Sequence, residues 1–152
     1  MIEPPRLRLT CQIDAELGPP MERGTVSGAV HRIIPIIGGT VSGERISGRV
    51  LNLGADWQMV HDSHAELDTR YGLETDDGAL IDIRNFGLRH GPPEVLAALA
   101  RGEPVAPEAY YMRTHPRLHS ADPRYAWVNR TIFLGTGERY KEAVRIGIFE
   151  VL

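Results

Sequence analysis

The sequence has almost no cysteine and no long apolar run. Cys11 is the single cysteine among 152 residues, so no intramolecular disulfide can form, and we expect a reducing, cytoplasmic setting. No stretch approaches the roughly 20 apolar residues that a membrane-spanning helix needs. Residues Met1 to Arg6 carry no apolar run after the basic residue, so we expect no signal peptide there. These absences predict a protein without a membrane partner.

Concentrated positive charge and phosphate-binding motifs are also missing. The formal net charge is -3 and the arginines are spread along the chain, so we expect no nucleic-acid partner. The segment Gly135-Thr136-Gly137 lacks the lysine of a phosphate loop and is expected to form a turn. No serine occupies a nucleophile elbow. The sequence therefore predicts no cofactor.

Two histidine pairs have spacings that metal sites use on helices. His61 and His64 are three residues apart, and His115 and His119 are four apart. Pro116 makes a helix through the second pair unfavourable. Neither pair stands beside a cluster of cysteines or glutamates, so the sequence predicts no metal site.

The sequence is rich in short β-like segments. Hydrophobic residues make up 42% of the chain, enough for a core in one domain spanning residues 1–152. Ala65 to Leu73 alternates clearly, and Asp76-Asp77-Gly78 is a hairpin turn signal before the strand Ala79 to Phe86. Other expected strands are Arg6 to Asp14, Val30 to Ile37, Ile46 to Leu51, Tyr110 to Thr114, Tyr125 to Leu134 and Val144 to Val151.

One short helix is expected among these strands. Pro92 and Pro93 fit its first turn, where a missing N–H costs nothing, and Gly102 fits its end. Many short strands separated by turns, with one helix, are typical of an all-β barrel or sandwich.

Four blocks of the sequence form a recognisable set. The blocks are Ile33-Ile34-Pro35-Ile36-Ile37-Gly38-Gly39-Thr40, Gly54-Ala55-Asp56-Trp57-Gln58, Asp68-Thr69-Arg70-Tyr71, and Tyr125-Ala126-Trp127-Val128-Asn129-Arg130-Thr131 continuing to Gly135-Thr136-Gly137-Glu138-Arg139. With these blocks the chain resembles a known family, the domain-of-unknown-function family 3237 of bacterial and fungal proteins. The resemblance runs from Leu7 to Leu152, and it implies a single small antiparallel, lipocalin-like β-barrel without an agreed activity.

Two pairs of residues in these blocks could carry chemistry. Asp56 at a barrel mouth, beside the indole of Trp57, could act as a general acid or base, or the pair could cap a turn and fill the core. Asp68 and Arg70 emerge from one strand face. They could bind a carboxylate or enolate, or they could form a solvated surface pair.

Aromatic and polar residues of two later segments are further candidates. Tyr111 and Arg113 share a face and could polarise a carbonyl, although a tyrosine packed between strands is the commoner arrangement. Trp127 and Asn129 also share a face if their segment is a strand. Asn129 could then hold a carbonyl oxygen in a pocket, or it could tie the barrel floor.

We interpret these residues first as a cofactor-independent enzyme, an isomerase, cyclase, lyase or hydrolase. Its ligand would be a small, partly apolar molecule with a carbonyl or carboxylate group. Catalytic candidates are Asp56, Arg70 and Arg113; substrate-binding candidates are Trp57, Asp68, Tyr111, Trp127 and Asn129. The alternatives are a non-catalytic carrier barrel and an assembly protein that forms a homo-oligomer.

Overall fold

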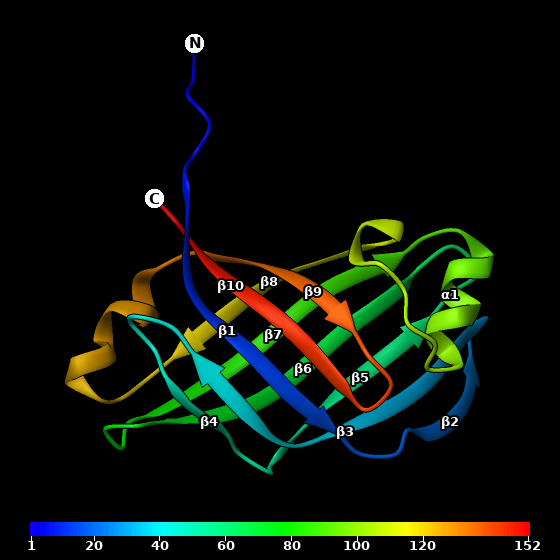
Figure 1. The fold of residues 1–152 in the computed structure, drawn as a ribbon, viewed down its shortest axis with the longest axis horizontal. Helices are drawn as coiled ribbons and strands as arrows, with labels where there is room; N and C mark the ends of the chain where they lie inside the picture. The colour runs from blue at the N-terminus through cyan, green and yellow to red at the C-terminus, as the bar shows by residue number, and fades with distance from the viewer.

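One antiparallel sheet runs through the computed structural model of residues 1–152 and closes into a barrel of eight strands (Figure 1). β4 and β5 lie end to end between β3 and β6 and fill the place of one strand. The predicted antiparallel β-barrel is confirmed. The strands are β1 (Leu7–Leu17), β2 (Met21–Val26), β3 (Ala29–Ser42), β4 (Gly48–Val50), β5 (Gly54–Val60), β6 (Ala65–Thr75), β7 (Leu80–His90), β8 (Tyr111–His119), β9 (Phe133–Arg139) and β10 (Ala143–Val151).

The long strand β3 closes the barrel. Its first half pairs with β2 and β5, and its second half pairs with β1 and β4. Gly39 lies opposite Ala15 at the β1–β3 seam, with a φ of 133°. A Cβ on Gly39 would lie 2.1 Å from the carbonyl oxygen of Asp14, so only glycine lets the two strands approach this closely.

The two halves of the barrel interior differ in polarity. Inward residues near the chain termini are apolar and almost fully buried, including Leu73, Ile81, Leu118, Phe133 and Ile148. The register of the strands places the inward polar residues at the opposite end, beside the helix α1 (Pro93–Ala100). Apart from Glu150, which is paired with Arg8 and Arg45, the end near the termini is a packed core, and most of the inward charged groups lie at the α1 end.

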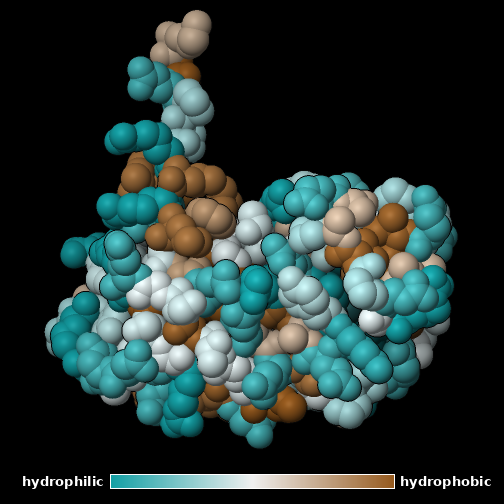
Figure 2. Space-filling model, in the orientation of Figure 1, coloured by the Kyte–Doolittle hydropathy of each residue, from teal (hydrophilic) through white to brown (hydrophobic).

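The helix α1 begins after Pro92 and ends before Gly102, whose φ is 72°, as the sequence predicts. Val95 and Leu99 pack against the core, although no residue of α1 is fully buried. Figure 2 shows one group of apolar side chains near α1 and a second at the base of the extended N-terminal segment, with mostly polar surface between them. No helix is long and apolar enough to cross a membrane. A short 3₁₀-helix, η1 (Pro107–Ala109), precedes β8.

The segment expected to be a strand from Tyr125 to Leu134 is mostly helical, so that prediction is wrong. Residues Pro123–Arg130 form a 3₁₀-helix, η2. Asp122 caps it, because its Oδ1 accepts the Arg124 N–H at 2.9 Å, and Pro123 begins its first turn. A proline after a capping aspartate marks a helix start, and this local signal prevails over the aromatic residues that follow.

The predicted turn at Gly135-Thr136-Gly137 is also wrong, because these residues lie inside β9. Both glycines face inward toward β8. A Cβ on Gly135 would lie 2.1 Å from Thr114 Oγ1, and one on Gly137 would lie 2.6 Å from Met112 Sδ. The glycines let β8 and β9 approach, and this close contact explains their presence in a strand.

Candidate functional site

The α1 end of the barrel encloses a small cavity lined by both apolar and polar residues. Its volume is about 40 Å³, which is room for water molecules or for one end of a ligand. Polar and charged groups from five strands converge on one side of it, and aliphatic groups of β1, β3 and β10 form the other. The polar lining residues are Asp56, Gln58, Thr69, Tyr71, Asn85, Arg89, Thr114 and Arg139.

Asp56 lies on β5 where the β5–β6 ladder is interrupted. Regular pairing stops after Asp56 and Thr69 and resumes at Met59. In the gap, Asp56 Oδ1 accepts the Asp68 N–H at 3.0 Å and Oδ2 accepts a hydrogen bond from Gln58 Nε2 at 2.7 Å. Burial nevertheless raises the pKa of the Asp56 carboxyl above its usual range. The side chain is thus fixed in place and can hold a proton more readily than an exposed aspartate.

Two arginines face the same cavity. Arg89 lies on β7 opposite Met112, and burial lowers the pKa of its guanidinium, opposed chiefly by the nearby Asp56 charge. Burial lowers the pKa of Arg139, on β9, to about 10. Arg139 Nη1 donates to the carbonyl oxygen of Ala143 at 3.0 Å, whereas Arg89 makes no hydrogen bond and no ion pair. Arg89 is partly buried, and a cation that loses part of its hydration without gaining a partner is costly, so an anionic ligand would satisfy it.

Three buried polar atoms of the cavity wall have no hydrogen-bond partner. They are Gln58 Oε1, Asn85 Oδ1 and Thr114 Oγ1. Their residues are only 3%, 4% and 6% exposed. Buried polar groups are nearly always hydrogen-bonded in proteins. Three buried polar atoms without a partner on one small cavity therefore indicate that it holds water or a ligand.

A wider vestibule connects the cavity to the surface beneath α1. Its volume is about 320 Å³, within the usual range of small-molecule sites. It shares Gln58, Arg89 and Arg139 with the cavity, and Leu96 and Leu99 of α1 form an apolar wall. The other cationic or titratable residues around it are Arg32, Arg101, Lys141, His61 and His64. This entrance attracts anions.

Comparison with known proteins agrees with this architecture. The family model for proteins of unknown function called DUF3237 matches residues 5–151. The chain belongs to the DUF3237 family. The family predicted from the sequence is thereby confirmed.

Two bacterial proteins show how similar this DUF3237 chain is to its relatives. An UPF0311 protein of Rhodopseudomonas palustris is 44% identical over 141 residues, which cover 92% of each chain. An UPF0311 protein of Clostridium acetobutylicum is 41% identical over 122 residues, 80% of this chain and 77% of the relative.

Solved structures share the barrel. A conserved R. palustris protein of unknown function superposes with a TM-score of 0.94 at 41% identity, with 100% of both chains covered. A β-barrel-like protein of Acinetobacter baumannii gives 0.84 at 40% identity, again with 100% of both chains covered. An enzyme from Penicillium herquei gives 0.75 at 16% identity, covering 100% of this chain and 98% of that one, a likeness of fold alone.

Among the residues that the sequence nominates, the structure places only Asp56 on the DUF3237 barrel cavity. Trp57, its neighbour on β5, points outward and is 50% exposed. Asp68 and Arg70 also lie on the outer wall, because the alternate residues of β6 face inward. Asp68 lies 3.6 Å from Arg84, a partly exposed surface pair.

The other nominated residues are dispersed. Tyr111 and Arg113 lie on the outer face of β8, with the guanidinium 5.5 Å from the Tyr111 ring centroid. Trp127 lies on η2 under Arg45, 3.5 Å away, and Asn129 exchanges two hydrogen bonds with the backbone of Ser120. Trp127 and Asn129 therefore anchor η2 and do not line the cavity.

Several nominated residues do gather on an outer groove of about 820 Å³ beside β2. Trp57, Asp68, Tyr111 and Arg113 line it. His31 Nε2, Arg32 Nε and Asp68 Oδ1 on this groove are also buried without a hydrogen-bond partner, but the side chains of Arg32 and Asp68 are 29% and 42% exposed, and a ligand gains little from partly exposed charges. The interior cavity, with its buried and unpartnered groups, is the better candidate for specific binding.

Arg89 and Arg139 are cavity residues that were not predicted from the sequence. A signal for Arg89 was present, because Ile81, Ile83, Asn85, Gly87 and Arg89 continue one alternating face. The predicted strand stopped at Phe86, whereas β7 extends to His90. Arg139 follows two inward glycines that were interpreted as a turn, so its place on a strand was hidden.

Proposed function

We propose that the chain is an enzyme that performs acid–base chemistry on a small, partly apolar molecule bearing a carboxylate or an enolisable carbonyl. The reactive end would enter the cavity and the remainder would occupy the vestibule under α1. A protein with this fold from P. herquei is an enzyme, so the barrel can support catalysis. Such chemistry requires no cofactor.

The observation that carries this proposal is Arg89, which faces the cavity, is partly buried, and has neither an ion pair nor a hydrogen bond. Arg139 faces the same space. A carboxylate or enolate oxygen placed between them would restore the interactions that burial removes. Specific anion binding thus explains two costly features that packing alone does not.

Asp56 supplies the proton transfer. With its pKa raised by burial, the carboxyl can take a proton from a carbon next to the substrate carbonyl and hold it. The electron pair moves to the carbonyl oxygen, and the resulting enolate lies against Arg89 and Arg139. Return of the same proton to another atom completes an isomerisation or a cyclisation without net change in protons.

A carrier barrel is the second candidate. It is favoured by the two hydrogen bonds that already satisfy the Asp56 carboxylate, since a purely structural aspartate would look the same. Both candidates require the anion site, so only turnover separates them.

Deuterium exchange distinguishes these candidates. A panel of small keto acids and aromatic carboxylates is screened by thermal shift, and each binder is followed by NMR in D₂O for exchange next to its carbonyl. The enzyme hypothesis expects exchange with the native chain, none with Asp56→Asn, and full exchange with Asp82→Asn, a control on the exposed face of β7. Binding without exchange in every protein would establish a carrier. If no anion binds, both hypotheses fail.

A further inference from the structure

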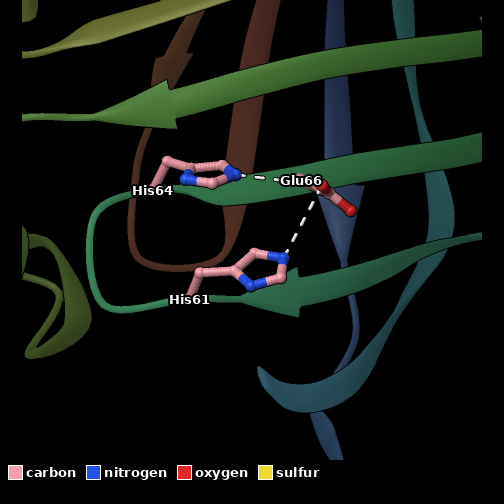
Figure 3. Close-up of side chains that lie close together, drawn as sticks. All are labelled: His61, His64 and Glu66. Carbon is pink, nitrogen blue, oxygen red and sulfur yellow. Dashed lines mark ion pairs between the residues drawn. The ribbon is translucent and has the colours of Figure 1, made fainter. Parts of the chain in front are cut away.

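The hairpin between β5 and β6 brings two histidines together at the rim of the vestibule (Figure 3). The His61 N–H donates to the His64 carbonyl oxygen at 2.8 Å, so the two residues face each other across the turn. Their rings are stacked with centroids 4.7 Å apart. Glu66, on β6, lies two residues after His64, which immediately precedes that strand.

The side-chain donor atoms of these three residues are close. Glu66 Oε1 lies 3.6 Å from His61 Nε2 and 3.8 Å from His64 Nε2. All three donor atoms lie within 4.8 Å of one another. Tetrahedral zinc with bonds of about 2.0–2.2 Å places its ligand atoms roughly 3.3–3.6 Å apart. The two separations from the carboxylate are already near those values.

A second observation points to a missing partner. His61 Nε2 is buried and makes no hydrogen bond. His64 Nδ1 lies 2.9 Å from Ser63 Oγ, and a ring that donates its Nδ1 proton to this hydroxyl keeps a free lone pair on Nε2. A hydrogen bond on the far ring nitrogen is the usual way in which proteins orient a metal-binding histidine.

We propose that His61, His64 and Glu66 bind one divalent ion of the zinc class. Two imidazoles and one carboxylate suit zinc, cobalt or nickel better than magnesium or calcium. Binding turns both rings out of their stack so that the Nε2 lone pairs meet at the ion, and their partial exposure of 32% and 34% leaves room for this rotation. Three protein ligands leave a fourth position for water or for an oxygen of an incoming anion.

This site is independent of the proposed acid–base function, because His61 and His64 lie at the rim of the vestibule, Glu66 lines the outer groove, and Asp56 lies inside the cavity. It also departs from the sequence-based expectation of no metal. That expectation treated the histidine spacing as helical, whereas a hairpin turn brings the same pair together across two strands.

Metal titration of the untagged protein tests the proposal. Zinc binding is followed by isothermal calorimetry, and cobalt binding by the intensity of its visible absorption, which is strong for four-coordinate sites. We expect one ion per chain, with affinity lowered at least about tenfold in each of His61→Ala, His64→Ala and Glu66→Gln. The control is His119→Ala, because His119 is an exposed histidine at the C-terminal end of β8, outside the proposed site.

Circular dichroism and thermal unfolding confirm that each variant is folded before titration. A triple variant combines His61→Ala, His64→Ala and Glu66→Gln. Equal zinc affinity in the native chain and in this variant would overturn the assignment, since the ion would then lie elsewhere. Absence of saturable binding by the folded native chain would overturn it as well.

Discussion

Arg89 and Asp56 face the same barrel cavity without forming an ion pair. The electrostatic influence of each on the other is smaller than the effect of its own burial. A directly paired aspartate and arginine would neutralise one another and leave nothing for a ligand. Their separation keeps a cation and a proton-transfer group available in one enclosed space, which is the arrangement that a small anionic substrate needs.

Replacing Arg89 with methionine should abolish anion binding while leaving the fold intact. The variant removes a partly buried cation that has no partner, so we expect unchanged or slightly higher stability, by up to about 1 kcal/mol. The affinity for carboxylates that bind the native chain should fall at least about tenfold. Calorimetric titration and thermal unfolding measure the two effects.

Arg70→Met is the matched control for Arg89→Met, because Arg70 is an exposed arginine on the outer face of β6. It should leave carboxylate binding unchanged. A loss of binding in Arg70→Met together with retention in Arg89→Met would place the anion site on the outer wall of the barrel.

Asp56→Asn should stabilise the protein at neutral pH. The native-state pKa of Asp56 lies above the unfolded value of about 3.9, so the folded chain retains this proton after the unfolded chain has lost it. The free energy of unfolding therefore falls as the pH rises from the unfolded pKa to the higher native pKa of Asp56, and the loss persists at pH 7. Asparagine carries no such cost, and Gln58 can turn its unpartnered Oε1 toward the new amide.

We expect a gain of about 1 kcal/mol for Asp56→Asn at pH 7, which should shrink toward zero below pH 4. Urea unfolding across this pH range measures the difference. A variant less stable than the native chain at pH 7 would show that the Asp56 carboxylate is a structural group and would favour the carrier hypothesis.

Thr114→Val should also stabilise the unliganded protein. Thr114 Oγ1 is buried without a partner, and valine keeps the shape of the side chain while removing the hydroxyl. The expected gain is about 1 kcal/mol in urea unfolding. A loss of similar size would mean that ordered water satisfies the hydroxyl in the resting cavity.

The opposite end of the barrel should respond to pH in the opposite direction. Glu150, only 6% exposed at its side chain, accepts hydrogen bonds from Arg8 and Arg45, each at 2.9 Å. These contacts lower the pKa of the Glu150 carboxyl, and the hydrogen bond from Arg8 has the largest effect. Its stabilising effect is therefore present above the unfolded value of about 4.3 and is lost as pH falls through the lower folded value.

Glu150→Gln should lower stability at pH 7 by about 1–2 kcal/mol, a modest effect because both arginines remain partly exposed. The difference from the native chain should narrow as pH falls toward 3. Thermal unfolding at several pH values measures it. A difference that is constant with pH would show that the loss comes from packing and not from charge.

The barrel could be predicted from the sequence because its strands alternate and its turns carry glycine and aspartate. The hairpin at Asp76-Asp77-Gly78 joins β6 and β7 as expected. The site could not be predicted in the same way, because alternation defines two faces but does not say which one is inside. Asp68 and Arg70 were chosen from β6, whereas Leu67, Thr69 and Tyr71 are the residues that face the cavity.

The sequence also does not show which residues of different strands meet when the barrel closes. Arg89 and Arg139 are 50 positions apart in the numbering, and β8 separates their strands. Their convergence on one cavity depends on the register of β7, β8 and β9. No local pattern in the sequence encodes that register.

The most direct test of the anion site is a crystal structure of the protein as purified, examined between Asp56, Arg89 and Arg139. We predict density for a carboxylate-bearing molecule, or for an anion, with an oxygen within hydrogen-bond distance of the Arg89 guanidinium. An Arg89 paired directly with Asp56 and a cavity closed by protein side chains would contradict the account.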